Sequence, residues 1–114
     1  MPLLKIQTNQ ELDPGRRAEL AKQASSQVAR MLGKPERYVM VALEYNPDML
    51  FAGDNGPLAY LELKSIGLPG ERTGDFSSTL CALVEQALEV PRDRIYIEFA
   101  DAARSMWGWN GGTF

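Results

Sequence analysis

The apolar pattern of residues 20–43 recurs in the same order over residues 76–99. In each copy, apolar residues at every fourth position predict one face of an α-helix, and apolar residues at alternate positions predict one face of a β-strand. A proline that ends the helix separates the two segments. The matched positions are Leu20, Ala24, Val28, Leu32, Pro35, Val39, Val41 and Leu43 in the first copy and Phe76, Leu80, Val84, Leu88, Pro91, Ile95, Ile97 and Phe99 in the second. Two copies indicate a duplicated unit rather than a solenoid.

A strand-like segment precedes each helix, over residues 2–8 and 58–66. The two halves of the chain, about 2–45 and 58–100, therefore each read strand, helix, strand. Parallel strands need a crossover connection of this kind, usually a helix. We predict a single α/β (α+β) domain over residues 1–114, in which a duplicated βαβ unit forms a four-stranded mixed sheet with both helices on one face.

The first helix has clear boundary signals. Asp13 can accept hydrogen bonds from the free N–H groups at its start, and Pro14 fits the first helical position. Gly33 suits the left-handed conformation in which many helices end. We predict a helix that begins after Asp13 and ends at Gly33.

The strand predicted over residues 38–45, "YVMVALEY", is apolar on both sides rather than alternating. This pattern is typical of a strand that is buried on both faces of its sheet. Two helices cover only one face, so the pattern predicts a partner chain on the other face and hence an oligomer. A second face that is solvated or covered by the tail is the alternative.

Composition excludes several functions. A net charge of −3 over 114 residues argues against nucleic-acid binding, and no apolar run reaches the roughly 18 residues of a membrane span. No leader-like segment opens the chain, so we expect a cytoplasmic protein, with leaderless secretion left open. The absence of histidine removes imidazole catalysis and His–metal sites. We expect no metal and no cofactor.

The remaining chemistry is restricted to a few groups. The single cysteine, Cys81, lies in an apolar segment and is predicted to be a buried structural thiol. Proton transfer must therefore come from carboxylates, lysine, tyrosine or the terminal amine. A free α-amino group has a reference pKa near ~8, against ~10.4 for lysine, so it is the amine most easily presented unprotonated at neutral pH.

Five segments, in this order, resemble the macrophage migration inhibitory factor family of the tautomerase superfamily: "MPLLKIQTN", "LGKPERYV", "LKSIG", "DRIYIEF" and "GWNGGTF". The resemblance covers essentially the whole chain. It implies that Met1 is removed, that Pro2 becomes a secondary-amine general base, and that three subunits form a barrel of sheets. It also implies active sites at the subunit interfaces and no cofactor.

The resemblance assigns roles to residues near the predicted helix and strand ends. It implies that Lys34 binds the substrate's carboxylate and lowers the pKa of Pro2, although a lysine there also complements the helix dipole. Ser65 and Ile66 resemble a pocket wall in which the backbone at Ile66 helps to bind substrate, and a buried strand end followed by a turn glycine is the alternative. For Pro2, the alternative is an ordinary proline at a strand edge.

Aromatic and acidic residues complete the implied site. Tyr96 resembles the aromatic group that a neighbouring subunit contributes, although a lone strand tyrosine is more often part of a core. Glu98 stands where the well-known members carry asparagine, and its carboxylate would repel an anionic substrate and raise the pKa of the amine. Aromatic surface comes from Tyr38, Trp107, Trp109 and Phe114, with core packing or intersubunit contact as the alternative.

The function that the resemblance implies is keto–enol tautomerisation of phenylpyruvate-like aromatic 2-oxo acids, an intramolecular isomerase reaction. Dopachrome is a second substrate, less favoured because of Glu98. A cytokine-like signalling or binding module with a weak or vestigial pocket is the alternative from another class, and a purely structural trimer is a third. Where some members have a Cys-x-x-Cys pair this chain reads "LAYL", so thiol–disulfide chemistry lacks its residues.

Overall fold

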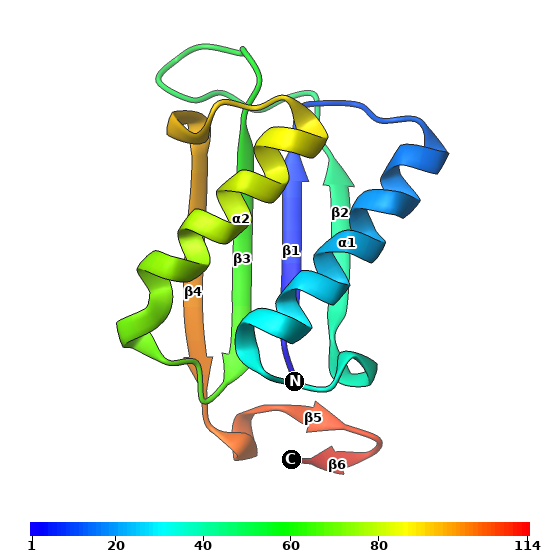
Figure 1. Cartoon of the computed structure of the whole chain (residues 1–114), viewed down its shortest axis with the longest axis vertical. Helices are drawn as coiled ribbons and strands as arrows, with labels where there is room; N and C mark the ends of the chain where they lie inside the picture. The colour runs from blue at the N-terminus through cyan, green and yellow to red at the C-terminus, as the bar shows by residue number, and fades with distance from the viewer.

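The computed structural model describes all residues, 1–114, and contains one four-stranded mixed sheet with two helices packed on one face (Figure 1). The strands are β1 (Leu3–Thr8), β2 (Met40–Tyr45), β3 (Ala59–Ile66) and β4 (Ile95–Ala102), and the helices are α1 (Pro14–Leu32) and α2 (Thr73–Leu88). The strand order is β2-β1-β3-β4. β1 and β2 are parallel, as are β3 and β4, and the central pair β1–β3 is antiparallel. The predicted duplicated βαβ fold is confirmed.

The predicted limits of α1 are also confirmed. The Asp13 carboxylate accepts the N–H of Arg16 at 2.9 Å, and Gly33 ends the helix with φ +62°. The second helix ends differently. Glu89 takes the left-handed conformation there, with φ +56°, a position where glycine would be unstrained. Short 3₁₀ turns follow or precede the main elements: η1 (Glu36–Tyr38), η2 (Gly70–Arg72), η3 (Arg92–Arg94) and η4 (Arg104–Met106).

The hydrophobic core lies between the two helices and the sheet. Alternate residues of β1 and β3, Leu4, Ile6, Leu61 and Leu63, face the helices and are fully buried. They meet Leu20, Ala24, Val28, Phe76, Leu80 and Val84, which are repeat positions of the two helices. Cys81 is buried in the same core, which confirms its prediction as a structural thiol.

The opposite face of the sheet carries charged side chains beside exposed Met40 and Tyr96. Lys5 Nζ lies 3.2 Å from a Glu44 carboxylate oxygen, and Lys64 Nζ lies 3.6 Å from one of Glu62.

The predicted burial of residues 38–45 on both faces, with a partner chain as the cover of the second face, stays a prediction. In the single chain Val41 and Leu43 pack against the core, whereas Met40 is 66% exposed. The reason is position: β2 is an edge strand, and its free edge and open face are uncovered.

The two ends of the sheet carry different structures. At one end, residues 49–57 form a loop held by Arg94, whose guanidinium donates to the Pro57 carbonyl at 2.8 Å and to the Asp54 carbonyl at 3.0 Å. At the other end lies a small hairpin of β5 (Gly108–Trp109) and β6 (Gly112–Thr113), beside the N-terminus (Figure 1). No helix has the length and apolar character needed to cross a membrane.

Candidate active site

Pro2 lies at the end of the sheet that carries the C-terminal hairpin. Its side chain is fully buried, and its carbonyl accepts the N–H of Met40 at 2.9 Å, which fixes it between β1 and β2. A hollow of about 320 Å³ opens there. The hollow is lined by Met1, Pro2, Leu3, Arg37, Tyr38, Val39, Met40, Trp107, Gly108, Trp109 and Phe114. The structure thus brings together three predicted site residues: Pro2, Tyr38 and Trp109.

Three aromatic rings form one wall of this hollow. The Tyr38 ring meets Trp109 edge to face at a centroid distance of 5.7 Å and meets Phe114 in the same way at 5.9 Å. Trp109 and Phe114 stack at 5.2 Å. The Arg104 guanidinium donates to a backbone oxygen of Phe114 at 3.1 Å and so helps to hold the tail in place. Each of the three rings therefore packs against the other two and also lines the hollow.

Lys34 lies just after the end of α1, near the terminal amine but outside the lining of the hollow. Its ammonium donates to the Ile66 carbonyl oxygen at 3.0 Å. The pKa of the Met1 α-amino group is lowered from its ordinary value of 8.0, first by burial and then by the positive charge of Lys34. Both effects penalise the protonated amine. The end of the sheet at which Pro2 lies thus favours a neutral amine.

Ser65 and Ile66 form the end of β3, and their side chains are buried. The Ser65 hydroxyl donates to the Ile66 carbonyl at 3.3 Å, the same oxygen that accepts from Lys34. Neither side chain lines the hollow. The Ile66 carbonyl anchors Lys34 in this chain, and the assignment of Ser65 and Ile66 to a pocket wall stays a prediction.

Tyr96 and Glu98 do not join Pro2 within one chain. Both lie on the open face of the sheet, where Tyr96 is 66% exposed. Glu98 is in register with Glu62, and therefore with Lys5 across β1, roughly 10 Å along the strand from Pro2. Tyr96 lies farther still, against the Phe51 ring at 4.9 Å. A pocket that contains Pro2 and either residue requires more than one copy of the chain.

Glu98 takes part in a hydrogen-bond cluster that the sequence did not suggest. The Tyr60 hydroxyl donates to Glu98 at 2.6 Å and lies 3.1 Å from a Glu62 carboxylate oxygen. The hydrogen bond to Glu98, followed by burial and by Glu62, raises the pKa of Tyr60 well above its ordinary value of 10.0. Residues 60 and 62 lie on one face of β3, and residue 98 lies on the same face of β4. Predicting their cluster from sequence would have required the β3–β4 register.

Sequence reasoning also missed Arg37 and Met40 as lining residues of the hollow, whereas Trp107 lines it together with the other aromatic residues. Arg37 stands three positions after Lys34, and this second cation beside an expected anion-binding residue was a usable signal. No group of three or more potential ligand side chains is placed to hold a metal ion.

The fold and the site define an α+β domain of a particular class, in which a duplicated βαβ unit places Pro2 at an aromatic hollow at one end of the sheet. The family model described as Macrophage migration inhibitory factor (MIF) matches residues 1–114, and the chain belongs to this family. Proteins of the family are isomerases of the tautomerase superfamily.

Individual relatives match over nearly their full length. The chain is 39% identical to a macrophage migration inhibitory factor homolog of Brugia malayi, over 100% of this chain and 99% of the relative, and 35% identical to macrophage migration inhibitory factor of Mus musculus, with the same coverage. The crystal structure of a homologue from Prochlorococcus marinus has a TM-score of 0.91 and 44% identity, over 98% of both chains. The predicted family is confirmed.

Proposed function

We propose that the protein is a keto–enol tautomerase of phenylpyruvate-like aromatic 2-oxo acids, with Pro2 as general base after removal of Met1. The observation that carries the proposal is the position of Pro2, which is buried at an aromatic hollow. At this end of the sheet, burial and then the charge of Lys34 lower the pKa of the adjacent Met1 α-amino group. Measuring the conversion of phenylpyruvate enol to the keto form by ultraviolet absorbance, with native and N-terminally altered protein, tests the proposal.

The reaction needs only proton transfers. In the keto-to-enol direction, the neutral amine of Pro2 takes a proton from the carbon next to the carbonyl group, and the electron pair of the broken C–H bond moves toward the carbonyl oxygen. The resulting ammonium returns a proton to that oxygen, which completes the enol. The reverse direction protonates the carbon. A base positioned in this way typically contributes ~10²–10⁴-fold to the rate.

The aromatic wall suits the substrate class. Tyr38, Trp109 and Phe114 present ring faces and edges to a hollow of about 320 Å³, within the size range of small-ligand pockets. A phenyl group gains from edge-to-face and offset contacts with such rings. This supports an aromatic 2-oxo acid over an aliphatic one.

Removing the charge of Lys34 is expected to move the acidic limb of the pH profile of kcat/KM to higher pH. The neutral amine is the active form, and a nearby cation makes protonation of the amine less favourable. Lys34→Gln therefore raises the pKa of the amine and lowers activity at pH values below it. The profile of kcat/KM against pH, measured for phenylpyruvate, gives the midpoint of the limb.

Two control variants separate charge from structure. Lys34→Arg keeps the positive charge, and we expect its acidic limb to stay near that of the native protein. Lys22→Gln removes an exposed lysine of α1 and should leave the limb in place. A limb that does not move in Lys34→Gln would show that Lys34 does not control the amine.

We propose that the active form is a homotrimer with sites at the subunit interfaces. Support comes from Tyr96 and Glu98, which lie on the open face away from Pro2, and from the uncovered edge strand β2. Sedimentation equilibrium at micromolar concentration should give a mass of about 38 kDa, three times the 12.7 kDa of one chain. A monomer mass under these conditions would contradict interface sites.

The alternative is a signalling role. The relative from Mus musculus is named for an effect on macrophage migration, and this name favours a cytokine-like module with a weak or vestigial pocket as the second candidate. Under that alternative the fold and the assembly persist, but changes at Pro2 leave the biological readout unchanged. The enzymatic proposal makes the opposite prediction.

A further inference from the structure

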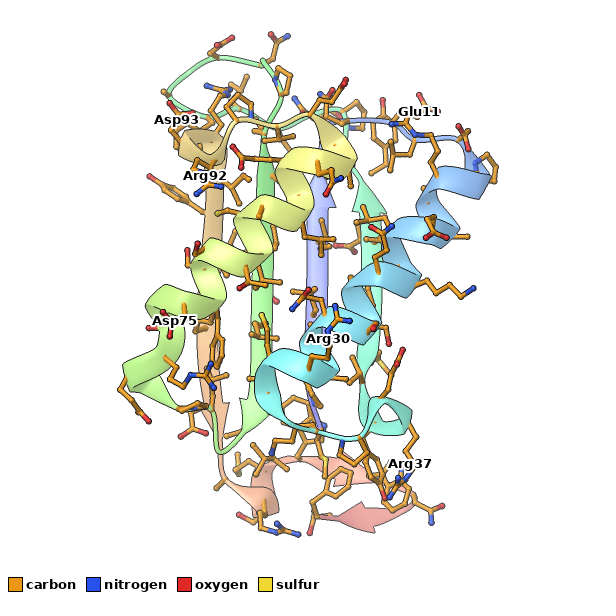
Figure 2. The ribbon with its side chains drawn as sticks, viewed as in Figure 1. Glu11, Arg30, Arg37, Asp75, Arg92 and Asp93 are labelled. Carbon is orange, nitrogen blue, oxygen red and sulfur yellow. The ribbon has the colours of Figure 1, made fainter.

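Arg37 lies at the rim of the hollow that contains Pro2. It is the middle residue of the 3₁₀ turn η1, which follows Lys34 and Pro35, and its side chain is exposed. Its guanidinium carbon lies 4.7 Å from the centroid of the Tyr38 ring. Figure 2 labels Arg37 at the end of the molecule that carries the C-terminal hairpin. The contact with Tyr38 holds a positive charge beside the aromatic wall.

The Arg37 guanidinium has no carboxylate partner in the chain. Three other arginines, Arg72, Arg92 and Arg94, each have a carboxylate oxygen at 3.9 Å or closer. The carboxylate next to Arg37 in sequence, Glu36, instead accepts from the Ser25 hydroxyl of α1 at 2.9 Å. The donors of Arg37 are therefore available to an external anion.

The hollow itself favours such an anion. None of its lining residues is aspartate or glutamate, and Arg37 is the only lining residue with a charged side chain. The one carboxylate of the lining is the C-terminal group of Phe114, which accepts a hydrogen bond from the Arg104 guanidinium at 3.1 Å. Lys34 is the other nearby cation, but it lies outside the lining and one of its donors is used by the Ile66 carbonyl. Of the two cations, Arg37 has the better access to a bound ligand.

We infer that Arg37 binds the carboxylate of the substrate and makes the site selective for 2-oxo acids over their neutral esters. The inference rests on the proposed function. A planar guanidinium matches a carboxylate with two parallel hydrogen bonds, which a lysine ammonium does not provide. The role of Lys34 is then to lower the pKa of the amine, and anion binding passes to Arg37.

The test compares phenylpyruvate with its methyl ester in native protein and in Arg37→Gln. Loss of a charge-assisted hydrogen bond is expected to raise KM for the acid roughly 10- to 100-fold, with a smaller change in kcat. The KM for the ester should change by less than about 3-fold, because the neutral ester has no carboxylate for Arg37 to bind. Arg37→Lys keeps the positive charge but not the planar guanidinium, so its KM for the acid should lie between those of the native protein and Arg37→Gln.

Arg16→Gln is the matched control, since it removes one exposed arginine charge from the first turn of α1. That turn lies at the end of the molecule away from the hairpin (Figure 1), and KM for the acid should stay at the native value. Far-ultraviolet circular dichroism checks that each variant keeps its fold. Equal effects of Arg37→Gln on acid and ester, or no effect on either, would overturn the inference and leave the proposed function standing.

A binding measurement keeps the two proposals separable. Trp107 and Trp109 line the hollow, so their fluorescence can report phenylpyruvate binding without catalysis. If native protein binds phenylpyruvate but does not convert it, the proposed function fails while the Arg37 inference is still decided by Kd. A Kd that is unchanged in Arg37→Gln would reject Arg37 as the carboxylate-binding residue.

Discussion

A form of the protein that keeps a residue before Pro2 is expected to lose tautomerase activity by ~10²–10⁴-fold, the usual contribution of a positioned base. When Met1 is attached, the nitrogen of Pro2 is part of a tertiary amide and its lone pair is delocalised into the carbonyl group. It cannot take a proton from substrate. The rate of phenylpyruvate ketonisation per mole of protein, with the N-terminal mass determined for each sample, measures the effect.

A second variant distinguishes the amine from its ring. Pro2→Gly, once processed, keeps a terminal amine but loses the pyrrolidine that fills the buried position between β1 and β2. We expect its activity to lie between those of the native and the extended forms. Equal rates in all three forms would remove Pro2 from the mechanism and favour the signalling alternative.

Much of the fold could be predicted because local signals and the core pattern agree. The spacing of Leu20, Ala24 and Val28 is enough to place the buried face of α1, and Asp13 and Gly33 mark its ends. The single four-stranded sheet followed from the repeat, whereas the antiparallel pairing of β1 with β3, which joins the two halves, was not predicted. Such agreement between cap residues and apolar periodicity is typical of sequences that specify one structure.

The details of the site depend on contacts between residues that are distant in sequence. The hydrogen bond from Lys34 to Ile66 joins a helix end to the end of β3, and no periodicity in either segment reports it. The cluster of Tyr60 and Glu98 depends on the β3–β4 register. The left-handed conformation of Glu89 at the end of α2 also had no signal in the sequence, since glycine is the residue that usually adopts it.

The open face of the sheet shows a limit of a different kind. The double-sided apolar pattern of β2 indicates burial on two faces, but in one chain only the face toward the helices is covered, where Val41 and Leu43 pack against the core. The apolar positions of a strand indicate each face that is buried, whether its own chain or a neighbouring chain covers that face. The sequence alone therefore does not say which chain supplies the cover.

Leu80→Ala is expected to lower the free energy of unfolding by about 2–5 kcal/mol, the range seen for buried leucines. Leu80 is fully buried in the middle of α2 and belongs to the core cluster shared by both helices and the sheet. Its neighbours come from separate elements, which restricts how far they can collapse into the space left by the side chain. Urea denaturation followed by circular dichroism, at one fixed protein concentration, gives the change.

Leu50→Ala removes the same atoms from a site that is 69% exposed, and it is the matched control. In one chain its effect should stay within about 0.5 kcal/mol. In an oligomer, stability depends on protein concentration. If a neighbouring chain covers Leu50, the Leu50→Ala variant would lose more stability on dilution than the native protein does. The loss caused by Leu80→Ala belongs to the core of each chain and should not grow on dilution. An effect of Leu80→Ala as small as that of Leu50→Ala in one chain would contradict the core described for α2.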